Sequence, residues 1–283
     1  MMIIPTIQIS LLLLILLSIT TFHITMSSNN HRVLGCNKKD QETLLIFKNG
    51  TTGSWDDSTT TWSAEEDCCA REGVHCNNII GRVIELDLLF RQLEGEINLC
   101  ILELEFLNYL KLTVYEFDVM VSIPTILPNI THASNLLYFE LSLMSMSYST
   151  SGLVSYIHMD NLDWLSSLSS LENLYLSGID LSKESNWIQG VSTLPSLLQL
   201  QISDWKPNNF MINPSIEYLN LSSIVTLDLS FNNFASHLPD GFFNLTKDLT
   251  YLRLHQSNIH GGIPSSLLNL QNLTYLDLSE NQL

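Results

Sequence analysis

The sequence predicts an α/β solenoid, in which short strands of successive repeats stack into one parallel sheet. The first observation is a pattern of two apolar residues separated by one other residue, which recurs eight times between residues 83 and 283. The second is its period of 24 to 35 residues, a spacing typical of stacked-repeat proteins. The third is composition: 45% of the 283 residues are apolar, which is enough for a continuous core.

Each repeat is predicted to begin with a strand whose two apolar side chains point to the same side, because alternate residues of a strand face opposite ways. Leucines three and six positions upstream, such as Leu168 and Leu171 before Leu174, add to this interior. One unit cannot close such a core, so neighbouring units stack and their strands pair in parallel. The first apolar residues of the predicted strands are Leu86, Leu110, Phe139, Leu174, Leu200, Leu227, Leu252 and Leu276.

Residues 1–28 are predicted to be a signal peptide. The apolar run at 11–19 follows ten uncharged residues and precedes a polar stretch, and it is too short to span about 30 Å of hydrocarbon. The alternative is an uncleaved membrane anchor, because no Lys or Arg precedes the run. We therefore expect a chain that enters the secretory pathway.

Charge excludes one class of function. The chain has 29 acidic and 12 basic residues and a net charge of −17, whereas a nucleic-acid-binding protein needs clustered Lys and Arg. Only 14% of the residues are charged, so surface polarity must come from Ser, Asn and attached groups. Glycans are predicted at the five N-x-[ST] sequons, which are those of Asn49, Asn129, Asn220, Asn244 and Asn272.

Five cysteines remain, and in an oxidising compartment some of them form disulfides while one is left over. Zinc is the competing interpretation, but the chain has no C-x-x-C pair, and His75 adjoins Cys76 too closely for both to reach one ion readily. We therefore expect no metal site. Cys100 is predicted to be a small buried apolar residue. The cysteines are Cys36, Cys68, Cys69, Cys76 and Cys100.

These features together resemble the plant extracellular leucine-rich-repeat proteins, whose pattern is L-x-x-L-x-x-L-x-L-x-x-N-x-L-x-G-x-I-P. The segments LRLHQSNIHGGIP (252–264) and LDLSENQL (276–283) carry it best, and LDWLSSLSSLENLYLSGIDLS (162–182) is similar to ectodomains of receptor-like proteins of the plant immune type. Residues typical of the N-terminal cap of this family also occur here in the family's order. They are Cys36, Asp40, Ser54-Trp55, Cys68-Cys69, Gly73-Val74, Cys76 and Gly81-Arg82-Val83.

The resemblance implies a right-handed leucine-rich-repeat superhelix with a parallel concave sheet. A disulfide-bonded N-terminal cap would occupy residues 29–82, and about eight repeats would occupy 83–283, incomplete at the C-terminus. It also implies two disulfides, Cys36 with Cys68 and Cys69 with Cys76.

Two departures from the family pattern stand out. Arg71 occupies a place where the family usually has Trp, and only Asn232 and Asn281 hold the ladder position whose amide satisfies loop backbone groups. Units around 113–170 are therefore expected to be irregular. The other ladder positions hold Arg91, Tyr115, Met144, Ile179, Trp205 and Ser257.

The concave face is the predicted ligand-binding surface, because five tyrosines occur among its sixteen outward strand positions and tyrosine is a rigid contact residue. The alternative is that tyrosine is simply a good strand residue that stacks on its neighbours. The predicted ligand-binding residues are Glu85, Asp87, Tyr109, Lys111, Tyr138, Glu140, Tyr175, Gln201, Asp228, Tyr251, Arg253, Tyr275 and Asp277.

The predicted function is recognition of a peptide or protein by a cell-surface receptor-like protein or kinase, in plant defence or development. Neither an enzyme nor a cofactor is expected, because G-x-S-x-G, Walker, H-E-x-x-H and dinucleotide motifs are missing from the sequence. The resemblance implies a co-receptor kinase as partner and a location at the extracellular face of the plasma membrane or in the apoplast.

Further repeats and a membrane anchor are expected beyond this chain, because the apolar flank of its last repeat would otherwise lack a polar cap. The alternative function is a secreted inhibitor of a cell-wall-degrading enzyme, similar to polygalacturonase-inhibiting proteins. The expected irregular middle and the lack of a C-terminal cysteine pair in this sequence count against it. The leucines of the flank are Leu270, Leu273, Leu276, Leu278 and Leu283.

Overall fold

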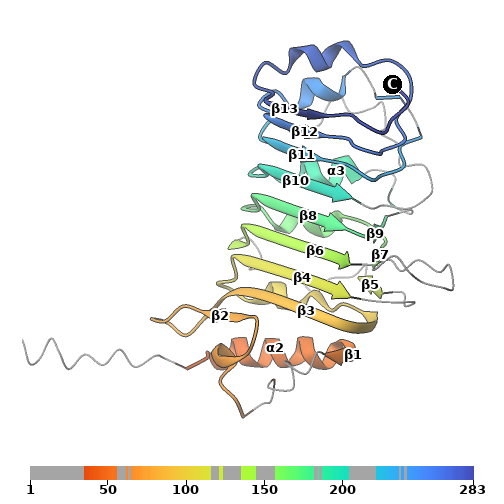
Figure 1. Ribbon diagram of the computed structural model, residues 1–283. Coiled ribbons are helices and arrows are strands. Elements are labelled where there is room, and N and C mark those ends of the chain that lie inside the picture. The colour runs from red at the N-terminus through yellow and green to blue at the C-terminus, as the bar shows by residue number, and fades with distance from the viewer. Residues whose placement is uncertain are drawn as a thin grey trace, which may run out of the picture.

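The computed structural model describes residues 35–55, 62, 65–115, 121–123, 135–144, 157–181, 184, 187–203, 221–235, 237–238 and 241–283. The predicted signal peptide and the sequons at Asn129 and Asn220 lie outside these residues. Eight parallel strands stack in chain order into one sheet (Figure 1), which confirms the predicted solenoid. They are β3 (Val83–Glu96), β4 (Tyr109–Tyr115), β6 (Tyr138–Met144), β8 (Asn173–Ser177), β10 (Gln199–Ser203), β11 (Thr226–Asp228), β12 (Tyr251–Arg253) and β13 (Tyr275–Asp277).

The register of the sheet matches the alignment of the sequence repeats. Leu110 of β4 pairs with Leu86 on one side and with Phe139 on the other, and the equivalent residues continue this row to Leu276. The first seven residues of the row are at most 2% exposed, whereas Leu276 is 46% exposed. The difference arises because β13 is the outer strand of the stack, so one side of its core residue faces no further repeat in the described structure.

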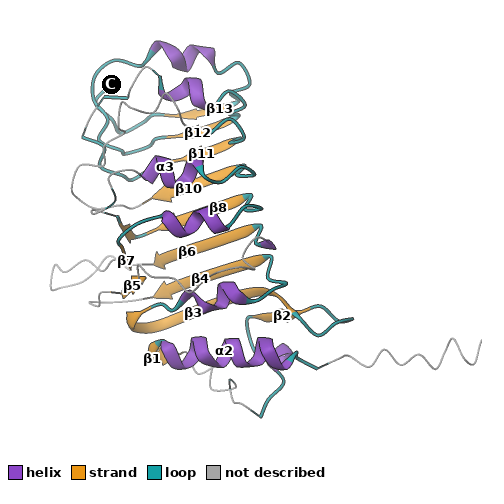
Figure 2. Ribbon diagram, turned by 180° about the vertical axis from the view of Figure 1, so that it is seen from behind, coloured by secondary structure: helices purple, strands orange, loops and turns teal. Residues whose placement is uncertain are grey.

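Short helices cover the opposite side of the sheet, as Figure 2 shows. Their apolar side chains, such as Leu165, Trp187 and Phe242, are buried against the strands, so the core lies between the two layers. No helix in the described part of the chain is both long and apolar enough to cross a bilayer. The helices are η3 (Leu99–Glu103), η5 (Asp163–Ser167), α3 (Trp187–Ser192), η7 (Phe242–Leu245) and η8 (Ser265–Asn269).

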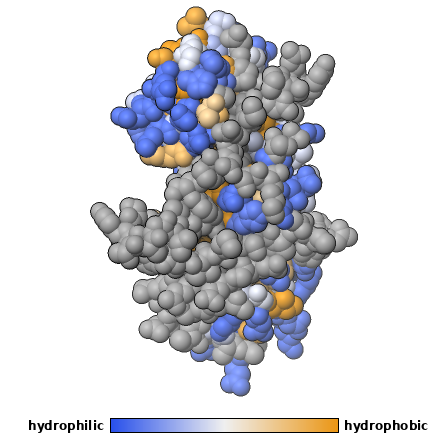
Figure 3. Space-filling model, turned by 90° about the vertical axis from the view of Figure 1, so that its right-hand side faces the viewer, coloured by the Kyte–Doolittle hydropathy of each residue, from blue (hydrophilic) through white to orange (hydrophobic). Residues whose placement is uncertain are grey.

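The described residues on one side of the molecule are mainly polar. Figure 3 looks at the side toward which the strands run, where the described residues are mainly hydrophilic and hydrophobic colour is confined to small areas. This agrees with a chain in which 14% of residues are charged, because uncharged polar side chains then supply much of the contact with water.

An N-terminal cap closes the first end of the stack. Helix α2 (Lys38–Gly50) is preceded by its N-cap residue Asn37, whose side chain accepts a hydrogen bond from the Lys39 backbone N–H at 2.9 Å, a common arrangement. Its residues Leu44 and Phe47 are fully buried. Strands β1 (Thr52–Trp55) and β2 (Val74–Cys76) both pair antiparallel with β3. The cap therefore covers the apolar edge that the first repeat would otherwise expose.

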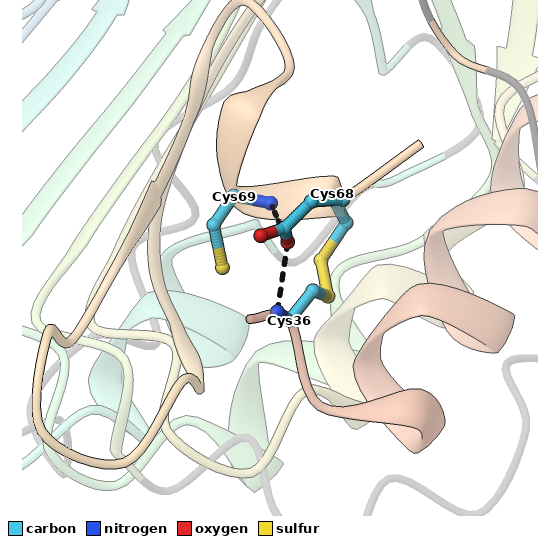
Figure 4. Close-up of side chains that lie close together, drawn as sticks. Cys36, Cys68 and Cys69 are labelled. Atoms are coloured by element: carbon cyan, nitrogen blue, oxygen red, sulfur yellow. Dashed lines mark hydrogen bonds between the residues drawn. A yellow bond between two sulfur atoms is a disulfide. The ribbon is translucent and has the colours of Figure 1, made fainter. Parts of the chain in front are cut away.

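Two disulfides hold the cap, Cys36–Cys68 and Cys69–Cys76, the pairing that the resemblance implies. The Asp67 carboxylate accepts hydrogen bonds from the backbone N–H groups of Cys36, at 2.7 Å, and Cys69, at 3.1 Å (Figure 4). Asp67 and its three neighbouring cysteines have the ligand spacing of a metal site. Their sulfur atoms are bonded in disulfides, however, and lack the thiolate that binds a metal. The cluster is a structural connection of the cap.

An ion pair joins the cap to the repeats. The Asp40 carboxylate, 1% exposed, accepts hydrogen bonds from Arg82 Nε at 3.0 Å and from the Val83 backbone N–H at 2.9 Å. Arg82 also contacts Glu105 at 3.2 Å, and its guanidinium lies 4.4 Å from the centre of the Phe106 ring. The hydrogen bond to Asp40 is the main cause of the raised pKa of Arg82. One arginine thus links α2, β3 and the second repeat.

Arg71 lies in the cap where the family usually has tryptophan. It is 3% exposed, and its guanidinium carbon lies 5.5 Å from the centre of the Trp62 ring. Burial lowers the pKa of Arg71 below its ordinary value. The arginine therefore occupies an interior position and packs on an aromatic ring there.

Within the units around 113–170, which the sequence predicts to be irregular, the described strands are regularly paired. Strands β4 and β6 remain paired as far as Tyr115 and Met144, two positions where the ladder asparagine is missing. A second parallel sheet continues from the end of β3 through β5 (Val121–Ile123), β7 (Ile157–Met159) and β9 (Ile179–Asp180). The physical reason is that pairing between strands satisfies backbone groups that asparagine amides satisfy elsewhere.

The two ladder asparagines act as predicted. Asn232 donates its side-chain N–H groups to the carbonyls of Ile202, at 2.7 Å, and Leu229, at 2.9 Å. Asn281 donates to the Leu254 carbonyl at 2.6 Å. Between them, the hydroxyl of Ser257 donates to the Leu229 carbonyl at 2.8 Å. Serine therefore replaces part of the asparagine ladder in this repeat.

Cys100 is a free, buried cysteine, as predicted. Burial raises the pKa of its thiol to about 12, so about one thiol in ten thousand is ionised at pH 8. We expect iodoacetamide to leave Cys100 unmodified in the folded protein at pH 8 and to alkylate it rapidly in 6 M guanidinium chloride without reductant. Peptide mass mapping measures both reactions. Fast alkylation of the folded protein would contradict the buried location.

Candidate functional site

The outward side chains of the eight strands form two columns, which we call the strand face. Strand register places each member beside its counterpart one repeat away, at the spacing of about 4.8 Å between strands. All the predicted ligand-binding residues lie in these columns. The first column is Glu85, Tyr109, Tyr138, Asn173, Gln199, Thr226, Tyr251 and Tyr275, and the second is Asp87, Lys111, Glu140, Tyr175, Gln201, Asp228, Arg253 and Asp277.

Three tyrosines form an N-terminal aromatic cluster on β4, β6 and β8. The rings of Tyr109 and Tyr138 stack with centres 4.3 Å apart and planes 10° apart. Tyr175 contacts Tyr138 with ring centres 5.2 Å apart. Adjacent strands place these rings within stacking distance, so their side chains are held in place before any ligand arrives.

Glu140 connects this cluster to the charged side chain of Lys111. Its carboxylate accepts a hydrogen bond from the Tyr138 hydroxyl at 2.5 Å and from the Ser142 hydroxyl at 3.3 Å, and it pairs with Lys111 Nζ at 3.6 Å. Burial and the hydrogen bond to Glu140 raise the pKa of Tyr138 above its ordinary value. The phenol therefore stays protonated and continues to donate at neutral pH.

A second aromatic cluster lies at the C-terminal end of the strand face. Tyr251 and Tyr275 stack with ring centres 4.3 Å apart and planes 4° apart. Beside them, Arg253 bridges two carboxylates, with Nη1 at 3.5 Å from Asp228 Oδ2 and Nε at 3.4 Å from Asp277 Oδ2. Hydrogen bonds from the hydroxyl and the backbone N–H of Ser279 hold the pKa of Asp277 below its ordinary value. The charges at this end are largely paired with one another.

Sequence reasoning missed Phe231 and His255, which lie beyond the strand ends beside this cluster. Phe231 is 43% exposed and contacts the His255 ring at 5.1 Å between centres. The guanidinium of Arg253 lies 5.6 Å from the centre of the Phe231 ring. The available signal was an exposed aromatic residue shortly after a strand, which analysis restricted to the two strand columns did not include.

The segment between the two clusters is polar, and Asp228, its charged strand-face residue, pairs with Arg253. Asn173, Gln199, Gln201 and Thr226 occupy it, and the Tyr175 hydroxyl donates a hydrogen bond to Gln199 Oε1 at 2.6 Å. Five strand steps separate β4 from β12, which corresponds to about 24 Å. The strand face thus presents two aromatic clusters joined by groups that donate and accept hydrogen bonds.

One histidine among the described residues lies between two carboxylates, on the second sheet. Nδ1 of His158 is 3.2 Å from Asp180 Oδ2, and Nε2 is 2.9 Å from Asp160 Oδ1. Carboxylate oxygens of the same chain therefore occupy both ring nitrogens. The arrangement is therefore structural, and Asp160 belongs to it rather than to a solvated acidic pair with Asp163.

Three predicted glycosylation sites are described, and their asparagines are exposed: Asn49 in α2, Asn244 in η7 and Asn272 before β13. None of the three belongs to a strand-face column. Glycans at these positions stay a prediction, and they would leave the columns themselves free of attached sugars.

Comparison with known proteins agrees with the fold. Residues 222–283 match the sequence family described as leucine rich repeat. Together with the stacked parallel strands and the disulfide-bonded cap, this match shows that the chain has the leucine-rich-repeat fold.

Its sequence relatives are plant receptor-like proteins. Receptor-like protein EIX1 of Solanum lycopersicum is 33% identical over 87% of this chain, and receptor-like protein EIX2 of the same species is 31% identical over 95% of it. The alignments cover 26% and 30% of the length of these relatives. The chain therefore spans less than a third of each.

Solved structures with this fold have different functions. The Arabidopsis receptor kinase HAESA, in complex with the peptide hormone IDA and the co-receptor SERK1, matches 87% of this chain and 38% of its own, with a TM-score of 0.64 and 24% identity. A plant ice-binding protein matches 88% of both chains, with a TM-score of 0.50 and 17% identity. The fold alone does not separate these functions, so the side chains of the strand face must be considered.

Proposed function

We propose that the chain is the extracellular ligand-recognition part of a plant receptor-like protein or receptor kinase, and that it binds a peptide or protein on the strand face. The observation that carries the proposal is the pair of stacked-tyrosine clusters, Tyr109 with Tyr138 and Tyr251 with Tyr275, on one surface. The similarity to EIX1 and EIX2 supports the receptor class.

The geometry of the strand face suits an extended peptide. At about 3.4 Å per residue, a segment of roughly seven residues spans the 24 Å from β4 to β12, which are the first strands of the two clusters. The side chains of Gln199 and Gln201 between them offer partners for peptide N–H and C=O groups. Because the tyrosines are already stacked, little side-chain entropy is lost when a ligand binds.

Partners and location are proposed by analogy. The complex of HAESA with a peptide hormone and the co-receptor SERK1 supports a co-receptor kinase as partner. A membrane anchor elsewhere in the whole protein would then hold this part at the extracellular face of the plasma membrane, facing the apoplast. Signalling in plant defence or development would proceed through that partner.

The test uses the purified, secreted chain and a displayed library of seven-residue random peptides. Peptides selected on the wild-type chain are expected to bind Tyr138→Ala and Tyr275→Ala at least about tenfold more weakly, because buried aromatic anchors contribute about 1.4 kcal/mol or more each. Biolayer interferometry with synthetic peptides measures the affinities.

The matched control is Leu268→Ala, which removes a side chain that is 85% exposed in η8, away from the strand face. It should leave every affinity unchanged. The proposal fails when the selected peptides bind both tyrosine variants as tightly as the wild-type chain, since their site would then lie elsewhere.

A further inference from the structure

The N-terminal end of the strand face carries two carboxylates without a cation partner among the described residues. Glu85 and Asp87 are both exposed on β3. At the other end of the face, Asp228 and Asp277 share Arg253. Glu85 and Asp87 contribute two uncompensated negative charges, whereas Asp228, Asp277 and Arg253 together leave one. The larger share of the uncompensated negative charge of the strand face therefore lies on β3.

Neighbouring charges do not cancel this concentration. Lys111 is the register neighbour of Asp87, but its Nζ contacts Glu140 on the far side. His75 of β2 pairs in register with Glu85 and is the other titratable group beside it. Glu85, Asp87, Lys111 and Glu140 together carry a net charge of −2, with His75 neutral.

The stack of aromatic rings ends beside these carboxylates. One face of the Tyr109 ring is covered by the Tyr138 ring, and the two ring centres are 4.3 Å apart. The register neighbour of Tyr109 on the other side is Glu85, which has no ring to continue the stack. Burial and, next, the charge of Asp87 raise the pKa of Tyr109, which places that carboxylate within electrostatic reach of the phenol.

The cap holds the backbone of β3 beside these carboxylates. The backbone N–H of Asp87 donates to the Gly73 carbonyl at 2.8 Å. Gly73 has φ +75°, and a Cβ added there would lie 2.2 Å from the Asp87 carbonyl oxygen. Only glycine permits β2 to approach β3 this closely. The backbone that carries Asp87 is therefore held rigidly against the disulfide-bonded cap.

We propose that this end of the strand face binds an arginine side chain of the peptide ligand, stacked on the outer face of Tyr109 and paired with Glu85 and Asp87. A planar guanidinium suits such a site because it stacks on an aromatic face and donates two parallel hydrogen bonds to carboxylate. The inference rests on the proposed function. It also orients the bound peptide, because its arginine would lie at the end of the strand face nearest the cap.

The test compares two acetylated and amidated tripeptides, Gly-Arg-Gly and Gly-citrulline-Gly, which have nearly the same shape and differ by one charge. Isothermal titration of the full chain at low salt is expected to show the arginine peptide binding at least about tenfold more tightly. The advantage should shrink when NaCl is raised from 20 to 500 mM, because salt screens exposed charges.

Variants locate the site. Glu85→Gln combined with Asp87→Asn should abolish the advantage of arginine over citrulline, and Tyr109→Leu should reduce it. The two carboxylates are exposed, so their replacement should leave the melting temperature close to that of the wild-type chain. Asp163→Asn also removes an exposed carboxylate, but from η5, and should leave the advantage intact.

Equal affinity of the wild-type chain for the two tripeptides overturns the inference. An arginine preference that survives the double variant also overturns it, since the cation would then bind elsewhere. Either result leaves the proposed function standing when library peptides still depend on Tyr275. The opposite outcome is also distinguishable. If library peptides no longer depend on Tyr275 but the arginine preference still requires Glu85 and Asp87, the proposed function is wrong and the cation site remains.

Discussion

Replacing Asp40 by alanine is expected to lower the free energy of unfolding by about 3 to 5 kcal/mol, the usual effect of breaking a buried ion pair from one side. Its carboxylate is 1% exposed and is the hydrogen-bond partner of Arg82 and of the Val83 backbone N–H. Without it, the buried N–H of Val83 loses its acceptor, and the mostly buried guanidinium of Arg82 keeps only the exposed carboxylate of Glu105. Urea unfolding followed by circular dichroism measures the loss.

Glu105→Ala is the matched control, because Glu105 pairs with the same Arg82 but its side chain is 42% exposed. It should cost less than about 1 kcal/mol, as surface ion pairs do. Asp40→Asn keeps one acceptor and should fall between the two. Equal losses for Asp40→Ala and Glu105→Ala would show that burial of the ion pair does not set its contribution.

Removing the Cys36–Cys68 disulfide is the second change with a large expected effect. The bond joins residues with a sequence separation of 32, and loop entropy assigns it about 3 to 4 kcal/mol. The segment that it closes includes α2 and β1 of the cap. We expect Cys36→Ala with Cys68→Ala to lower the free energy of unfolding by that amount in urea titrations.

The chain supplies its own comparison, Cys69→Ala with Cys76→Ala. This second disulfide has a sequence separation of only 7, so its expected contribution is smaller, about 2 kcal/mol. Both double variants remove two sulfur atoms from the same cap. A loss from the short loop that equals or exceeds the loss from the long one would contradict the entropic account.

The cap also bears on recognition, because it supports the strand that carries Glu85 and Asp87. Both β1 and β2 pair with β3, and Asp40 holds the first residue of β3. A destabilised cap should therefore weaken arginine binding before it affects the cluster around Tyr251 and Tyr275, which lies at the opposite end of the sheet.

Repeat register was predictable because two periodicities determine it. Alternation within a strand decides that Leu86 and Leu88 face the core while Glu85 and Asp87 face outward. The repeat length then places Leu110 beside Leu86, and every later pair follows in the same way. The disulfide pairing was predictable by resemblance, because the order of cap residues in this sequence follows that of the family.

The middle of the chain was not predictable in the same way. A missing asparagine at Tyr115 or Met144 shows only that backbone groups need other partners. That the partners are neighbouring strands depends on how β4, β6 and the second sheet pack. Contacts of this kind join residues from different repeats, and no local pattern records them.

By itself, the sequence determined which side chains point out of the sheet, their order along it and the excess of acidic over basic charge. Tertiary structure alone decided that Glu140 joins Tyr138 to Lys111, that Arg253 pairs with two aspartates, and that Glu85 and Asp87 stay unpaired in the described structure. The physical reason is that side-chain direction follows from backbone alternation, whereas pairing depends on distances and rotamers that are set only when residues about 25 positions apart pack together.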